Sequence, residues 1–419
     1  MREMKDSNIE WIGDIPSDWH LIKGKYIFTQ RSQRGNENEL QLLSPTQKYG
    51  VIPQDLYEKL SGMNAVKLND KTNLSLLKTI HIGDYCISLR SFQGGFEYSE
   101  YEGVVSPAYQ VFFNTIDINK GYYKYLFKDN SFIEKMNSYT MSLRDGKNIA
   151  FSDFGNTYIP YPPVSIQKQI ADFLDSKCNL IDALTADIQT QIETLEQYKK
   201  SVITEAVTKG LNPYVDMKNS GIEWIGKIPS HWNIIKGKYL LKYLQKPVRP
   251  TDEVITCFRD GEVTLRSNRR EDGFTISDKE IGYQGIDIGD LVVHGMDGFA
   301  GAIGISDSRG KASPVLNVLD TVHNKKYIMY YLRSMAYSNV FVALATGIRV
   351  RSCDLRWNKL AELPYPVPPV EEQKQISDYI VLQLSKADEV ICDKKNQLEL
   401  LADYKKSMIY EYVTGKKEV

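Results

Sequence analysis

The sequence predicts an α+β protein of two mixed α/β domains separated by two long helices, which pack as an antiparallel coiled coil with a pseudo-two-fold internal repeat. Three observations predict this class. A segment near the start recurs in mid-chain, a second block recurs near the end, and both copies of that block have heptad spacing. The 419 residues suffice for two or three domains of roughly 150 residues each.

The first repeat opens each half of the chain. Residues 7–28, SNIEWIGDIPSDWHLIKGKYIF, return from residue 220 as SGIEWIGKIPSHWNIIKGKYLL, with 15 of 22 positions identical. Trp11 and Trp19 thereby recur as Trp224 and Trp232. Such tryptophans either stack on bases, as in proteins that bind single strands, or staple a domain to a helix, and their place at a junction favours stapling. The Lys-Gly-Lys tripeptides at 23–25 and 236–238 either touch phosphate or form solvated turns.

The second repeat predicts the two helices. Residues 162–208 return at 368–414 with 21 of 47 positions identical, and the first copy has neither Gly nor Pro after its opening prolines. About 44 residues at ~1.5 Å each would form a rod of roughly 66 Å, close to two turns of B-DNA at ~34–36 Å. A stalk for oligomerisation is the alternative. Two copies in one chain, each after a globular domain, favour a spacer.

The heptads predict a seam between the helices. An a row repeats every seven residues from Leu174, and a companion d row stands four residues before each of its members. Lys394 interrupts the a row of the second copy. The residues expected to pair the helices are Ile170, Leu174, Ile181, Leu184, Ile188, Leu195 and Tyr198 in the first, and Ile376, Ile380, Val390, Leu401 and Tyr404 in the second.

The stretches between the repeats, 29–158 and 242–363, resemble each other only faintly, although the motif Ile82-Gly83-Asp84 survives as Ile288-Gly289-Asp290. β-Branched and aromatic runs predict strands at 85–89, 104–113 and 291–294, and short helices are expected at 122–127 and 327–333. The expected domains are 1–158 and 212–363, with helical spacers at 159–211 and 364–419.

Composition and motifs argue for a binding protein. The 52 basic and 53 acidic residues nearly cancel, so any contact with nucleic acid would depend on local basic patches. The sequence has no phosphate-binding loop, dinucleotide fingerprint, zinc-protease motif, nucleophile elbow or Asn-Pro-Pro-aromatic element. Five scattered cysteines without a CxxC pair argue against disulfides and structural zinc. We therefore expect no catalytic residues, no metal and no cofactor in this chain. With no ~20-residue apolar stretch and a polar start, we also expect a cytoplasmic protein without a membrane segment.

Polar and basic loops of the two unlike domains supply the candidate DNA-binding residues. Arg can read guanine, Asn and Gln can read adenine, and Lys and Arg can also grip phosphates. Each residue alone could equally be solvated surface, but their place in the parts that differ between copies favours recognition. The candidates are Ser44, Thr46, Lys48, Tyr49, Arg90, Ser91, Gln93, Arg144 and Lys147 in the first domain, and Arg259, Arg266, Asn268, Arg269, Arg270, Arg349 and Arg351 in the second.

These motifs together resemble the DNA specificity subunits of type I restriction-modification systems. The resemblance rests on IEWIGDIPSDW and IEWIGKIPSHW, on SLRSFQGGF after a Gly-Asp turn, and on YPPVSIQKQI and VPPVEEQKQI before the helices. It implies two target recognition domains that each read half of a split, asymmetric site in double-stranded DNA, with the helices setting the unread gap. It also implies two methyltransferase subunits that use S-adenosylmethionine, and two restriction subunits that use ATP, as partners.

Two other functions stay open at this point. One is a non-catalytic coiled-coil adaptor that holds two protein-binding domains. The other is a self-sufficient methyltransferase or nuclease, which the missing motifs disfavour.

Overall fold

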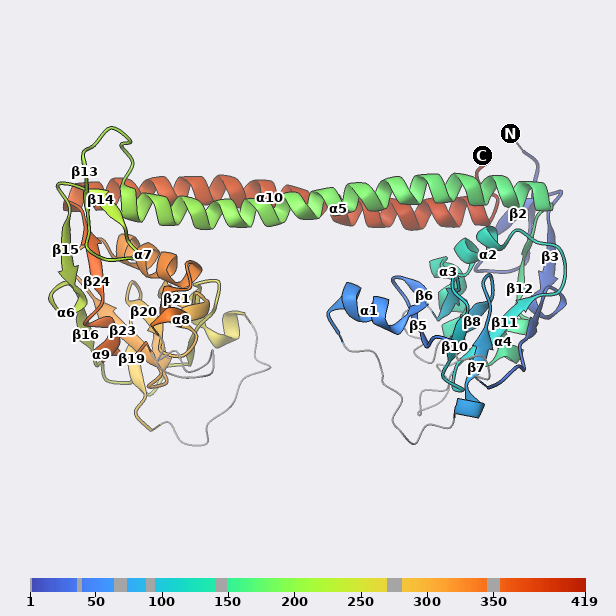
Figure 1. The fold of residues 1–419 in the computed structure, drawn as a ribbon, viewed down its shortest axis with the longest axis horizontal. Coiled ribbons are helices and arrows are strands. Elements are labelled where there is room, and N and C mark those ends of the chain that lie inside the picture. Colours follow the sequence, from blue (N-terminus) through green and yellow to red (C-terminus); the bar gives the residue numbers. More distant parts are fainter. Residues whose placement is uncertain are drawn as a thin grey trace. The chain divides into compact units, whose positions relative to one another are not determined.

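A computed structural model describes residues 2–35, 40–63, 74–87, 95–139, 149–269, 281–344 and 355–419. The chain divides into two compact units, Met1–Ile188 with Asn396–Val419, and Gln189–Lys395. Each unit holds one mixed domain and part of both long helices, α5 (Val164–Lys209) and α10 (Val370–Val413) (Figure 1). The predicted α+β class is confirmed.

A four-stranded antiparallel sheet, ordered β4-β11-β8-β9, forms the centre of the first domain. Its core is aromatic, since Phe28, Tyr85, Phe112 and Phe127 are at most 1% exposed and their ring centroids lie 5.2–6.0 Å apart. The sheet strands are β4 (Phe28–Gln30), β8 (Tyr85–Ile87), β9 (Phe96–Tyr98) and β11 (Gln110–Asn114). Two-stranded pairs surround it: β1 (Met4–Asp6) with β2 (Asp14–Pro16), β3 (His20–Lys23) with β12 (Tyr158–Tyr161), β5 (Leu43–Thr46) with β6 (Gly50–Pro53), and β7 (Lys78–Ile80) with β10 (Gly103–Val105). The helices are α1 (Gln54–Ser61), α2 (Lys120–Leu126), α3 (Asn130–Ser138) and α4 (Phe151–Asn156).

The second domain repeats this strand topology with the sheet order β16-β23-β20-β21. Its sheet strands are β16 (Lys242–Leu244), β20 (Leu291–His294), β21 (Ile303–Ile305) and β23 (Leu316–Asp320). The pairs are β13 (Met217–Asn219) with β14 (Lys227–Pro229), β15 (Asn233–Lys236) with β24 (Pro364–Val367), β17 (Ile255–Cys257) with β18 (Val263–Leu265), and β19 (Gln284–Ile286) with β22 (Gly310–Ala312). The helices are α6 (Gly237–Leu240), α7 (Lys325–Tyr337), α8 (Val340–Ala343) and α9 (Trp357–Leu360). Two faintly similar sequences therefore adopt one topology.

The surviving Gly-Asp motif builds the turn before each central strand. Gly83 and Gly289 have φ of 87° and 83°, a left-handed conformation that disfavours other residues. Asp84 Oδ2 accepts a hydrogen bond from the His81 N–H at 2.9 Å, and Asp290 Oδ2 accepts one from the Asp287 N–H at 2.8 Å. The motif thus survives because both copies need the same turn to start β8 or β20.

Within each unit, α5 and α10 run antiparallel and are joined by an ion pair. Lys405 Nζ lies 2.6 Å from Asp182 Oδ1 in the first unit, and Lys199 Nζ lies 2.6 Å from Asp388 Oδ1 in the second. Lys405 and Asp388 are the repeat counterparts of Lys199 and Asp182. The interrupting Lys394 finds a polar partner, because its Nζ donates to Gln191 Oε1.

The seam between the helices differs from the predicted one in its companion row. Residues of the a row are buried or half-buried, namely Leu174, Ile181, Ile188, Leu195, Ile380 and Leu401. Four members of the predicted d row, Leu184, Tyr198, Val390 and Tyr404, are instead 43–60% exposed. The buried companions stand one residue later and include Cys178, Ile192 and Ile391. Ile170 and Ile376, which set the predicted row, are buried because they join the hydrophobic clusters of their own domains.

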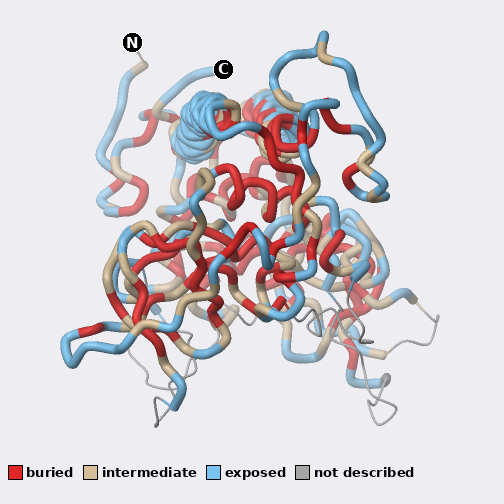
Figure 2. The backbone as a smooth tube through the Cα atoms, turned by 90° about the vertical axis from the view of Figure 1, so that its left-hand side faces the viewer, coloured by how far each residue is buried: buried red, intermediate tan, exposed pale blue. Residues whose placement is uncertain are grey.

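Matching polar staples join each domain to the long helices. The buried Gln167 accepts a hydrogen bond from the Asn119 N–H at 2.8 Å, and its repeat counterpart Gln373 accepts one from the Asn324 N–H at 3.0 Å. These asparagines cap α2 and α7, which lie between the sheet and the long helices of their own unit (Figure 1). Buried residues accordingly gather in the sheets and on the inward sides of the long helices (Figure 2).

Buried tyrosines and tryptophans complete the junctions. Tyr122 donates its hydroxyl to Val413 O at 2.6 Å, and Tyr327 donates to Val207 O at 3.1 Å. Trp19 and Trp232 are fully buried. Because neither ring is accessible, these two residues staple the junction and do not stack on bases.

Candidate nucleic-acid interface

The hairpin of β5 and β6 carries the first group of candidate residues. Ser44 lies in β5 opposite Ile52. Thr46 closes the turn, because its Oγ1 accepts from the Tyr49 N–H at 3.0 Å and donates to the Gly50 carbonyl at 3.0 Å. Lys48 is exposed at the tip, with Nζ 5.0 Å from the centroid of the Tyr49 ring. Thr46 therefore shapes the turn, which presents a cation beside an aromatic ring, a pairing suited to phosphate and base contacts.

A cleft of about 420 Å³ lies behind this tip in the first unit. Residues 47–52 form one wall, the end of β9 forms another, and α5 and α10 form the third. Its charges are mixed, so the cleft as a whole has no strong sign. The charged residues of its lining are Lys48, Glu97, Glu100, Lys124, Lys128, Asp175, Asp182 and Lys405.

The equivalent hairpin of the second unit, β17 with β18, borders a larger cavity of about 750 Å³. Three candidate arginines line it, Arg259, Arg266 and Arg269, together with the aromatic residues Phe258 and Tyr283. Guanidinium forks and aromatic faces in one cavity can bind phosphates, base edges and base faces.

Carboxylates orient two of these guanidinium groups. Arg259 Nη2 lies 2.9 Å from Asp297 Oδ1. Arg269 Nη2 lies 2.5 Å from Asp260 Oδ2, and its Cζ lies 4.2 Å from the Phe258 ring centroid. Burial alone would raise the pKa of Asp260, but the hydrogen bond from Arg269 lowers it, so this carboxylate is ionised and holds the arginine. The hairpin thus presents arginines in set orientations.

Candidate Asn268 is turned back onto its own hairpin. Its Nδ2 donates to Thr264 Oγ1 at 2.9 Å, so reading an adenine with both amide atoms would first require this bond to open.

The cavity of the second unit offers neither a reactive thiol nor a charged histidine. Burial raises the pKa of Cys257 to about 12, so its thiol stays protonated. Burial also lowers the pKa of His294, and its Nδ1 accepts N–H groups from Met296 at 3.2 Å and Asp297 at 2.9 Å. The Nδ1 atom of His294 is therefore occupied by the backbone of its own turn.

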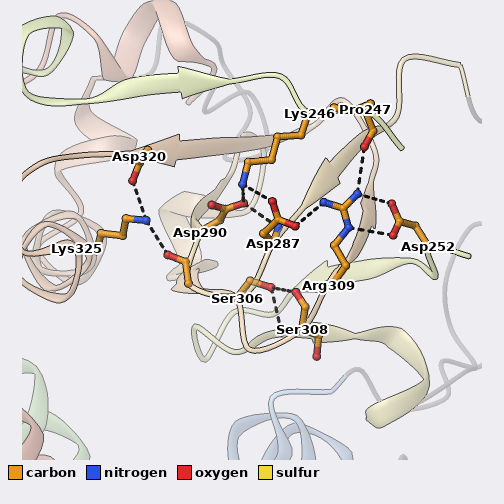
Figure 3. Close-up of polar contacts among 11 residues, drawn as sticks. Lys246, Pro247, Asp252, Asp287, Asp290, Ser306, Ser308, Arg309, Asp320 and Lys325 are labelled. Carbon is orange, nitrogen blue, oxygen red and sulfur yellow. Dashed lines mark hydrogen bonds and ion pairs between the residues drawn. The ribbon is translucent and has the colours of Figure 1, made fainter. Parts of the chain in front are cut away.

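A network of charges braces the second domain behind this hairpin (Figure 3). Arg309 Nη2 lies 2.7 Å from Asp252 Oδ2, and its Nη1 lies 2.6 Å from Asp287 Oδ1. Lys246 Nζ lies 2.8 Å from Asp287 Oδ2 and 2.6 Å from Asp290 Oδ2. The hydrogen bond from Arg309 lowers the pKa of Asp252, and that from Lys246 lowers the pKa of Asp287. Because carboxylates of the same domain hold both cations, this network stabilises the fold around the hairpin.

The first domain has a smaller version of this brace. Arg31 pairs with Asp84 through Nε at 2.7 Å and Nη2 at 2.9 Å. The Gly-Asp motif therefore binds a cation from the end of the first sheet strand, β4 or β16, in both domains.

The remaining candidates lie outside the described residues. They are Arg90, Ser91, Gln93, Arg144, Lys147, Arg270, Arg349 and Arg351.

Sequence reasoning missed several positions that the structure makes prominent. Gln167, Gln373, Tyr122 and Tyr327 had a usable signal, because each pair recurs at nearly the same place in both copies. Lys128 and Arg333, which contact the hairpin tips, had none, since the surrounding sequences diverge.

Within the described part of the chain, no group of three or more His, Cys, Asp or Glu residues is arranged to hold a metal ion. No helix described there is both long enough and apolar enough to cross a membrane.

Comparisons with known proteins agree with this architecture. A family model described as a type I restriction modification DNA specificity domain matches residues 20–194. The protein named MjaX specificity subunit of a type I restriction enzyme, from Methanocaldococcus jannaschii, is 24% identical over 441 residues, covering 97% of this chain and 95% of that protein. The MjaVIII specificity subunit of the same organism is 38% identical over 104 residues, covering 24% of this chain and 23% of that protein.

Two solved structures share the fold. The HsdS subunit from Thermoanaerobacter tengcongensis has a TM-score of 0.53 at 12% identity, covering 98% of this chain and 100% of that one. A chain from a structure on complex assembly and conformational transition of the type I R-M system has a TM-score of 0.69 at 12% identity, covering 96% and 99%. With the duplicated motifs and the two units of one topology, these matches make the chain similar to type I restriction-modification DNA specificity subunits along nearly its whole length.

Proposed function

We propose that this chain is the sequence-specific DNA-binding subunit of a type I restriction-modification complex and that it reads a bipartite, asymmetric target. One observation carries the proposal: two units of one topology each present a hairpin with basic and aromatic residues beside a cleft. Because the tips differ, with Lys48 and Tyr49 in one and Arg259 in the other, they would read different half-sites.

The two long helices would set the unread gap between the half-sites. Supporting this, α5 and α10 each continue without a break through 46 and 44 residues. The ion pair Lys199–Asp388 and its counterpart Lys405–Asp182 would hold the two helices in one register.

Catalysis would belong to partners: two methyltransferase subunits that use S-adenosylmethionine and two restriction subunits that use ATP. The exposed apolar residues of the helices support docking of two copies of one partner. Leu184 and Val390 are repeat counterparts, as are Tyr198 and Tyr404, so each unit offers one leucine or valine and one tyrosine.

The test selects bound duplexes from a random pool with the complex of this chain and its methyltransferase partner. A split motif with two unlike halves is expected. Exchanging residues 29–158 for another recognition domain should then change one half only. A change in both halves, or in neither, would contradict the modular assignment.

A non-catalytic adaptor that holds two protein-binding domains is the second candidate, because exposed apolar side chains on helices also suit protein contacts. If the chain binds DNA without sequence preference in every complex with its partners, the proposed DNA-reading function is wrong and the adaptor function remains.

A further inference from the structure

In each unit, one cation reaches across to the tip of the hairpin. Lys128 Nζ donates a hydrogen bond to the Gln47 carbonyl at 3.2 Å. Arg333 Nη2 donates one to the Asp260 carbonyl at 2.6 Å. Lys128 stands nine residues after the cap residue Asn119, and Arg333 stands nine residues after Asn324. In both domains, whose sequences are only faintly similar, a cation at the equivalent position therefore donates a hydrogen bond to the tip of the hairpin.

The anchor of Lys128 is a buried carboxylate on β9. Lys128 Nζ lies 2.5 Å from Glu97 Oε2, and the Glu97 side chain is 1% exposed. Its second oxygen, Oε1, is buried and has no hydrogen-bond partner among the residues that the structure describes. A buried, ionised carboxylate with one unbonded oxygen destabilises the folded state. The ion pair with Lys128 is therefore the main interaction that stabilises the ionised form of Glu97.

The second unit reaches the same arrangement without a carboxylate. Glu97 stands two residues before Ser99, which bridges to Val51, and Gly304 stands two residues before Ser306, which bridges to Val263. Gly304 therefore occupies the place of Glu97. A Cβ there would lie 1.9 Å from the Gly261 carbonyl, so the hairpin packs directly on the strand backbone.

The side chain of Arg333 is held differently from that of Lys128. Its Nε donates to the Tyr337 hydroxyl at 2.8 Å. A tyrosine on the same helix thus orients the second clamp, where a carboxylate on the sheet orients the first.

We propose that Lys128 and Arg333 are positioning residues that hold the two hairpin tips in their DNA-reading conformation, and that Glu97 makes the first of these clamps sensitive to pH. The inference deepens the proposed function and rests on it. Neither residue needs to touch DNA, since each acts through a main-chain carbonyl next to a candidate contact residue, Lys48 or Arg259.

The pH at which the first clamp responds follows from the surroundings of Glu97. Burial raises the pKa of Glu97 from 4.5 to about 7, and the nearby Lys128 opposes that rise. Cys86 of β8 is its electrostatic neighbour on the sheet, and burial keeps that thiol protonated. The other charged groups around the cleft are Lys48, Glu100, Lys124, Asp175, Asp182 and Lys405. Below about pH 7, Glu97 becomes neutral and Lys128 loses its ionic partner.

The experiment uses the complex with its methyltransferase partner and probes that carry single changes in one half-site of the selected motif. Lys128→Met should lower discrimination at the first half-site about tenfold and leave the second unchanged, the scale of losing a charge-assisted hydrogen bond. Arg333→Met should do the reverse. Lys135→Met on α3 removes an equal charge seven residues further along the chain and should change neither half-site.

The pH profile separates positioning from general stability. From pH 6 to 8, discrimination at the first half-site should rise in the wild type, while the second half-site stays flat. Over that range the stability of the fold should fall, because a carboxyl whose pKa is raised by burial favours the folded state only while protonated. Glu97→Gln should abolish the rise in discrimination and make the fall in stability smaller. If Lys128→Met does not fold, the pH dependence of discrimination in the wild type and in Glu97→Gln tests the first clamp instead.

Unaltered discrimination in both Met variants, or equal losses at both half-sites, would overturn the clamp. The clamp would also be overturned if discrimination at the first half-site fell with rising pH in the same way as the stability of the fold. Binding without any sequence preference in the wild type would instead overturn the proposed function itself.

Discussion

Inserting one heptad into both long helices tests whether they measure DNA. The insertion points are after Ile188 and after Lys395, where the chain passes from one compact unit to the other. Seven residues restore the phase of the seam, whose rows repeat every seven positions. Each helix would lengthen by ~10.5 Å at ~1.5 Å per residue, which matches about three base-pair steps of ~3.4 Å. The preferred gap between half-sites should therefore grow by about three base pairs.

Affinity at the new gap should be lower than in the wild type. Three added base pairs turn one half-site by roughly 100° around the DNA axis, at ~10.5 base pairs per turn, and the complex must absorb that twist. The assay selects duplexes from pools with every gap length, using the complex with its methyltransferase partner. Seven Gly and Ser residues inserted after Asn212, in the turn beyond α5, lengthen the chain but no helix, and should leave the gap unchanged. A heptad variant that binds with the original gap would refute the spacer.

Individual contacts lead to three further outcomes. Tyr327→Phe should lower the free energy of unfolding by ~1–3 kcal/mol in urea titrations, because its buried hydroxyl bonds main-chain carbonyls, whereas Tyr239→Phe, 77% exposed, should change nothing; equal effects would contradict the staple. Asp388→Asn should cost less than about 1 kcal/mol, and the loss should shrink in 1 M salt because this carboxylate is 58% exposed. A larger, salt-independent loss would mean that the pair does more than align the helices. Burial raises the pKa of Asp129 from 3.8 to about 6, so the folded state binds more protons than the unfolded state in that window, and stability should fall as pH rises through it. Asp129→Asn, which keeps an acceptor for the α3 cap, should reduce the slope of melting temperature against pH below about pH 6 and leave the part that Glu97 contributes; a slope equal to that of the wild type would refute the assignment.

The repeats allowed much of the fold to be predicted. Identical residues at constant spacing identify two copies of one unit, and a block without Gly or Pro predicts a helix whatever its surroundings. The α+β class follows from these local patterns. The common topology of 29–158 and 242–363 could not be predicted from their faint similarity. Many different sequences can form the same strands, because a strand requires only an alternating pattern of buried residues and turns at its ends.

The candidate site was predicted only in outline. Lys48, Tyr49 and Arg259 do lie at hairpin tips. Thr46 and Asn268, in contrast, donate hydrogen bonds to residues of their own hairpins. Residue type predicts what a side chain can bind, whereas its partners depend on which neighbours the fold supplies.

The duplicated plan, the unbroken helices and the lack of catalytic motifs can all be read from the order of residues, since they depend on near neighbours in the chain. The helix face that meets its partner was decided only in three dimensions, because Ile170 and Ile376 are buried by a domain and so mimic a seam position. The same holds for the clamps of Lys128 and Arg333. Each joins segments more than 70 residues apart, and a contact of that kind depends on how the sheet, helix and hairpin pack together.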